Sequence, residues 1–147
     1  MLKRNKRKSK PKKKNLGRYA SGIEKYCAEQ LKNHGIAFDY EEHKFELMDS
    51  FRFPHTYLKM TAKGKVMSDR TGKMQHSITY KPDFMGKDGK WVIETKGYLP
   101  SHHDFPMRWK LFLRHIVEND LGYAVFLAKN QGHQAIQEIL KIQRDDR

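Results

Sequence analysis

The stretch KPDFMGKDGKWVIETKG, residues 81–97, decides how the rest of the chain is interpreted. Its second half, Trp91–Lys96, begins with an apolar run that predicts a buried central strand and ends in charged residues. The preceding Lys87-Asp88-Gly89-Lys90 indicates a tight turn, because Asp-Gly tolerates the positive φ that such turns require. We therefore expect a hairpin whose first strand is His76–Phe84 and whose second strand is Trp91–Lys96.

This hairpin would bring three charged residues together. Side chains two positions apart on a strand point to the same side, so Glu94 and Lys96 project together, and Asp83 would lie beside Glu94. Two carboxylates placed in this way attract a hard divalent cation, Mg²⁺ or Mn²⁺, and the Thr95 carbonyl would complete the coordination. Lys96 would hold a phosphate or orient an attacking water. The pattern predicts metal-dependent phosphodiester hydrolysis.

An ordinary structural explanation competes with this hypothesis. Asp after Pro is common in turns, and a Glu–Lys pair on an exposed strand is an ordinary solvated face. We favour the catalytic interpretation because Glu94 and Lys96 follow Trp-Val-Ile, and two charges in a buried strand are costly without a function.

The remaining patterns predict alternating helices and strands. Ser21 and Glu24 form a capping-box pattern at the start of a helix. We expect helices at 21–34, 106–119 and 134–142. Strands are expected at 36–40, continued through 44–47, and at 123–128, where the strand would be buried on both sides. Residues 48–75 would form a hairpin or insertion with a possible strand at 52–62. This order predicts an α/β fold in which a mixed central β-sheet is flanked by helices in three layers, within one domain spanning residues 19–147.

The charge of the chain is unevenly distributed. Lys and Arg number 30 against 17 Asp and Glu, for a net charge of +13, and nine of the basic residues fall within positions 1–14. We expect residues 1–18 to form a disordered basic arm that binds DNA phosphates. The candidate contacts are Lys12, Lys13, Lys14 and Arg18. A solubility tail or a localisation signal would have the same composition.

The single cysteine, Cys27, excludes an intramolecular disulfide framework and makes a cysteine zinc site implausible. The chain shows neither the apolar stretch of a signal peptide nor a segment as long as a membrane span. These features predict a cytoplasmic protein with no membrane partner. His102-His103 would approach the metal site, although a flexible polar loop explains the pair equally well, and Tyr98 would stack on a base.

Pro82-Asp83 together with Glu94-Thr95-Lys96 resembles the PD-(D/E)XK nuclease superfamily. Within it, the chain is similar to the phage endonuclease I family of Holliday-junction-resolving enzymes. The likeness runs from about Ser21 to about Ala128 and is carried by Ser21–Glu24, Gly35–Glu41, Pro82–Phe84 and Ile93–Gly97, in that order. The stretch between Glu41 and Asp83 is longer here than expected for that family.

The resemblance implies a restriction-endonuclease-like core and Mg²⁺-dependent resolution of branched DNA, with one or two ions per site and Mn²⁺ as a substitute. It also implies an intertwined homodimer. If the chain is a phage-encoded recombination enzyme, as the resemblance implies, it would act in the cytoplasm of a bacterial host. The resemblance further places Glu24 beside the metal as a fourth catalytic residue and ligand, although the capping box explains Glu24 without catalysis. Arg108, Lys110 and Arg114 match phosphate-contacting positions, for which a solvated helix face is an equal alternative.

Two other functions are compatible with the sequence. A nicking, repair or transposition-associated endonuclease of the same fold would act on linear or mismatched DNA, and the long region 42–82 motivates this alternative. A non-catalytic nucleic-acid-binding protein would explain the charge of +13, but it leaves the pattern of Asp83, Glu94 and Lys96 to chance.

Overall fold

The computed structural model describes residues 15–64, 67–97, 104–129 and 133–146. Its central sheet contains four strands in the order β1-β8-β9-β10. Their bounds are Phe38–Tyr40 (β1), Phe84–Gly86 (β8), Trp91–Lys96 (β9) and Ala124–Lys129 (β10). β9 pairs antiparallel with β8 and parallel with β10, so the sheet is mixed, as predicted.

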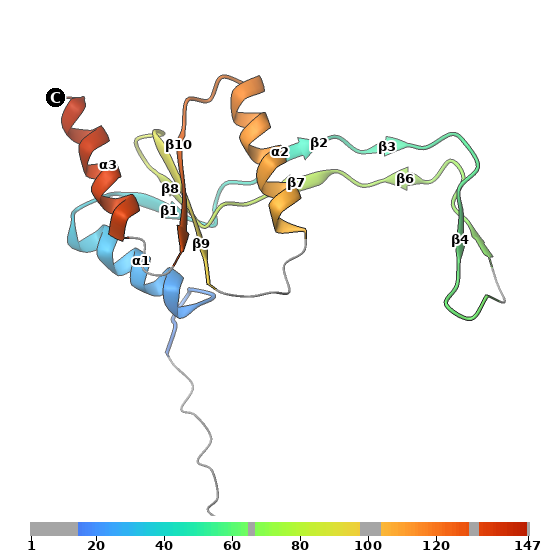
Figure 1. Cartoon of the computed structure of the whole chain (residues 1–147), viewed down its shortest axis with the longest axis horizontal. Coiled ribbons are helices and arrows are strands. Elements are labelled where there is room, and N and C mark those ends of the chain that lie inside the picture. The colour runs from blue at the N-terminus through green and yellow to red at the C-terminus, as the bar shows by residue number, and fades with distance from the viewer. Residues whose placement is uncertain (1–14, 65–66, 98–103, 130–132, 147) are drawn as a thin grey trace, which may run out of the picture.

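Helices cover both faces of this sheet. α1 (Gly22–Asn33) and α3 (His133–Asp145) lie on one side, and α2 (Phe105–Glu118) lies on the other (Figure 1). The side chains of β9 alternate between the two faces of the sheet, so this strand packs against both helical layers. Trp91 and Ile93 join the apolar cluster with α1 and α3, whereas Val92 joins the cluster with α2. The predicted mixed α/β architecture with flanking helices is confirmed.

The local signals of the hairpin and the first helix are also present. Gly89 has a φ of 73° in the turn between β8 and β9. At the start of α1, the backbone N–H of Glu24 donates to Ser21 Oγ over 3.2 Å, as a capping box requires.

Several strand predictions were wrong. The strand predicted at 36–40 ends with β1 at Tyr40, and residues 45–48 form a strand of another sheet. His76–Phe84 is not one strand, because β7 (Ile78–Tyr80) ends before Pro82, which has no N–H to donate to a ladder. The strand predicted at 123–128 is not buried on both sides. It forms β10 at the edge of the sheet, and of its residues only Ala128 is buried.

Between β1 and β8 the chain makes a long excursion that we call the ribbon, residues 45–80. It consists of nested antiparallel pairs, β2 with β7, β3 with β6 and β4 with β5, and it projects away from the body (Figure 1). The other bounds are Phe45–Met48 (β2), Phe51–Arg52 (β3), Leu58–Met60 (β4), Met67–Asp69 (β5) and Met74–Gln75 (β6). The strand predicted at 52–62 is therefore interrupted between β3 and β4.

The ribbon also carries most of the exposed large hydrophobic side chains of the described residues. These are Met48, Phe51, Phe53, Tyr57, Leu58, Met60, Met67 and Met74. At its root, Phe45, Leu47 and Tyr80 pack into the apolar cluster with α2, but the rest of the ribbon contributes little to the core. Within the described residues, no helix combines the length and the apolar character needed to cross a membrane.

Candidate active site

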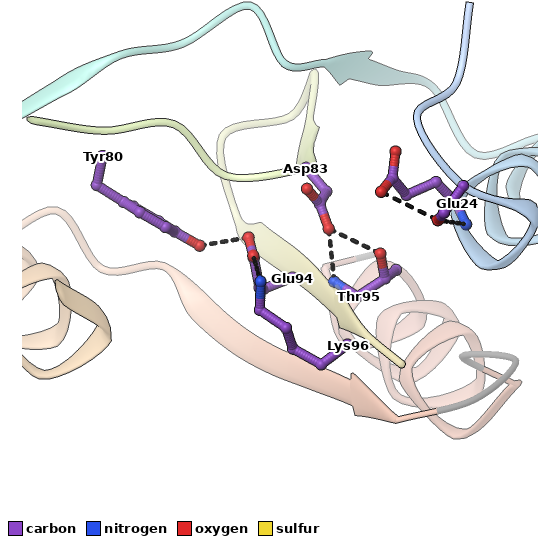
Figure 2. Close-up of polar contacts among 7 residues, drawn as sticks. Glu24, Tyr80, Asp83, Glu94, Thr95 and Lys96 are labelled. Atoms are coloured by element: carbon purple, nitrogen blue, oxygen red, sulfur yellow. Dashed lines mark hydrogen bonds and ion pairs between the residues drawn. The ribbon is translucent and has the colours of Figure 1, made fainter. Parts of the chain in front are cut away.

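Glu94 and Lys96 lie on the face of β9 that is turned toward α2. The Glu94 side chain belongs to a residue only 4% exposed, and its Oε1 lies 2.9 Å from Lys96 Nζ. Its other oxygen, Oε2, accepts a hydrogen bond of 2.5 Å from the Tyr80 hydroxyl (Figure 2). Because side chains alternate along the strand, Glu94 and Lys96 lie on the same face of β9, as predicted. Tyr80, at the end of the ribbon, holds the Glu94 carboxylate in place.

Asp83 precedes β8 and is also buried. The pairing of Phe84 with Ile93, continued by one residue, places Asp83 opposite Glu94 on the neighbouring strand. Asp83 Oδ2 accepts hydrogen bonds of 2.7 Å from both the backbone N–H and the hydroxyl of Thr95 (Figure 2). Thr95 therefore orients the Asp83 carboxylate with two donors.

The surroundings of Asp83 perturb the pKa of its carboxyl group. Burial, together with the neighbouring charge of Glu94, raises the pKa of Asp83 to about 7. The two hydrogen bonds from Thr95 lower this pKa, and the more distant Glu24 raises it. Near neutral pH Asp83 is therefore only partly ionised, and a cation placed beside it would favour its charged form.

Glu24 approaches the same region from α1. Its Oε2 accepts hydrogen bonds from the Tyr40 hydroxyl and the backbone N–H of Ala20, and its Oε1 accepts one from Ser21. Ser21 therefore caps α1, but the Glu24 carboxylate accepts from the Ala20 N–H and not from the Ser21 N–H, so the capping box is only half formed. The catalytic and ligand roles of Glu24 stay predictions, supported by its influence on the pKa of Asp83.

The residues of the site fit a hard cation such as Mg²⁺ or Mn²⁺ better than Zn²⁺ or Cu²⁺. The available donors are carboxylate oxygens, and Asp83 Oδ1 accepts no hydrogen bond from the described residues. Among those residues, no group of three or more His, Cys, Asp or Glu side chains is placed to hold one ion. Mg²⁺ commonly binds one or two carboxylates and keeps several waters, so Asp83 and Glu94 would suffice.

The predicted DNA contacts on α2 separate in space. Arg108 lines the same cavity as Glu94 and Lys96, and its guanidinium lies 2.8 Å from Asp104. Lys110 is exposed, and because it follows Arg108 by two residues, or about 200° of helical rotation, it faces the other side of α2. Arg114 is also exposed and lies 2.6 Å from Glu118.

The candidates near the N-terminus are only partly described. Arg18 lies over the ring of Tyr40 at 5.3 Å and 4.0 Å from Glu42, so it rests against the body beside α1. Lys12, Lys13, Lys14, Tyr98, His102 and His103 lie outside the described residues.

The structure adds three residues that we did not expect from the sequence: Tyr80, Lys44 and Lys81. All three line a cavity of about 420 Å³ that also contains Glu94 and Lys96. The only signal for them was the proximity of Tyr80 and Lys81 to Pro82-Asp83 in the chain. Comparisons of the sequence and structure with protein-family models, curated proteins and solved structures found no match.

Proposed function

We propose that the chain is a metal-dependent endonuclease that hydrolyses phosphodiester bonds in DNA. The observation that supports it best is the pair of buried carboxylates, Asp83 directly before β8 and Glu94 on the neighbouring β9, with Lys96 Nζ 2.9 Å from Glu94. The apolar core does not need these charges, and burying them costs free energy, so their placement is best explained by chemistry.

Each residue of the group has a distinct role in this proposal. Asp83 and Glu94 would hold Mg²⁺ or Mn²⁺, with the Thr95 carbonyl as a further ligand and Glu24 as the candidate for a second ion. When bound, the ion lowers the pKa of an attacking water and polarises a phosphoryl oxygen.

The chain's own side chains would then prepare the site. Tyr80 holds Glu94 in place, while the Thr95 donors hold Asp83. Lys96 is partly exposed and lines the cavity, where it would offer a positive charge to a phosphate. That charge stabilises the negative charge that develops on the phosphate during hydrolysis.

Cleavage of a synthetic four-way junction, with and without Mg²⁺, tests the proposal. Glu94→Gln should lower the cleavage rate by about a hundredfold or more while junction binding persists. Glu46→Gln, which changes an exposed carboxylate on β2, is the matched control and should cut normally. Cleavage by the Glu94 variant at the normal rate would show that the assignment is wrong.

Branched DNA, cut by a homodimer, is the substrate we favour, because the motif order resembles the junction-resolving family. The long ribbon favours a second candidate, an endonuclease acting on linear or mismatched DNA. Equal amounts of four-way junction, mismatched duplex and perfect duplex should be compared, with sedimentation of the protein to measure its oligomeric state. DNA binding without cleavage of any of them, in Mg²⁺ or Mn²⁺, would instead favour a non-catalytic DNA-binding protein.

A further inference from the structure

The cavity beside Glu94 carries more positive charge than the candidate active site requires. Four cationic side chains line it, Lys44, Lys81, Lys96 and Arg108, against two acidic ones, Glu94 and Asp104. Lys96 pairs with Glu94, and Arg108 pairs with Asp104. Neither Lys44 nor Lys81 forms an ion pair with another described side chain.

The fold places these two lysines opposite one another at the root of the ribbon. Phe45 of β2 pairs with Tyr80 of β7, and this register continued by one residue sets Lys44 against Lys81. Like charges directly across an antiparallel pair are destabilising. An anion bound between them would relieve this repulsion.

The shape of the cavity indicates the class of anion. A volume of about 420 Å³ exceeds what a bare phosphate needs and suits a phosphate with its attached sugar. Tyr80 and Phe105 give the cavity an aromatic wall, and Lys96 Nζ lies 4.0 Å from the centre of the Phe105 ring. Lysine ammonium groups bind phosphate as point charges.

We propose that Lys44 and Lys81 bind a phosphodiester group that neighbours the one cleaved beside Glu94 and Lys96. This inference rests on the proposed nuclease function for the identity of the ligand. Anion binding by the two lysines follows from the geometry of the cavity and is testable without cleavage.

The test measures binding of a dinucleotide with a 5′-phosphate, and of inorganic phosphate, by calorimetry in EDTA. The variant Lys44→Ala/Lys81→Ala should lower the affinity for the dinucleotide by about tenfold or more. The matched control, Lys87→Ala/Lys90→Ala, removes the same charge from the β8–β9 turn, at the other end of β9, and should change affinity less than about twofold. Lys44→Gln/Lys81→Gln repeats the test if the alanine pair folds poorly.

Cleavage kinetics add a second measurement. Because Lys44 and Lys81 would touch the neighbouring phosphate and not the reacting atoms, their loss should raise KM by about tenfold with kcat almost unchanged.

Three results would overturn the inference. One is equal loss of affinity in the control, which would indicate general attraction to a basic protein. Another is unchanged affinity in both lysine variants. The third is inorganic phosphate binding as tightly as the dinucleotide, which would assign the cavity to free phosphate. If the lysine variant loses dinucleotide affinity but the wild-type chain cuts no DNA, the anion site stands and the nuclease proposal fails.

Discussion

Replacing Asp83 with asparagine should stabilise the metal-free protein and abolish the proposed nuclease activity. The Asp83 pKa rises from the ordinary 3.8 to about 7 in the folded protein, so the unfolded chain releases this proton at lower pH than the folded chain does. Stability that depends on Asp83 therefore falls as pH rises from about 4 to about 7, and is level above that. The substituted side chain would carry no charge, and its amide oxygen would still accept both hydrogen bonds from Thr95.

The size of the effect follows from the pKa shift. At about 1.4 kcal/mol per pKa unit, the wild-type protein loses about 4 kcal/mol by about pH 8, but less than about 1 kcal/mol near pH 4. Asp83→Asn should remove this loss, so the difference between the two proteins grows with pH.

Urea unfolding in EDTA at a series of pH values measures this difference directly. Asp49→Asn, at an exposed position at the start of the ribbon, is the control and should run parallel to wild type at every pH. Added Mg²⁺ should stabilise wild type near pH 8 and leave the Asp83 variant almost unchanged. Parallel curves for the Asp83 variant and wild type would refute the premise that this buried carboxylate destabilises the fold.

Three further predictions concern packing and the ribbon. A methyl group at Gly86 would lie 2.5 Å from the Trp91 indole nitrogen, so Gly86→Ala should cost about 1–3 kcal/mol of unfolding free energy in urea. Tyr80→Phe removes the hydroxyl that donates to Glu94, and should cost about 1–3 kcal/mol and lower cleavage of a four-way junction about tenfold, with binding retained. Replacing residues 54–71 with Asn-Gly shortens the ribbon outside the core, and should change the unfolding free energy by less than about 1 kcal/mol; a larger loss would show that the ribbon supports the body.

The parts of the site that could be predicted from sequence are those set by local periodicity. Glu94 and Lys96 share a face because strand side chains alternate, and this requires only the assignment of β9. Asp83 required one further step, the turn at Asp88-Gly89, whose residues have a strong conformational preference. Tertiary context was not needed for any of the three.

The residues that escaped prediction depend on pairings distant in sequence. Lys44 and Lys81 line the same cavity only because the whole ribbon between them folds back in register, and no local pattern shows that register. On α2, the apolar face was visible in the sequence, but the structure was needed to show that Arg108 reaches the cavity and Lys110 does not. The edge position of β10 likewise depends on strand order, which its apolar composition does not contain.

The nested pairing of the ribbon has a consequence for how quickly the domain folds. Tyr40 of β1 pairs with Phe84 of β8 across an interval of about forty residues, and closing so long a loop in one step costs conformational entropy. If β4 and β5 pair first, followed by β3 with β6 and β2 with β7, each step closes only a short loop. The pairing then proceeds from the tip of the ribbon to its root and ends when β1 pairs with β8 in the central sheet. Stopped-flow refolding should therefore slow when the pairing of β4 with β5 is disrupted, even though that pair adds little to the stability of the folded core.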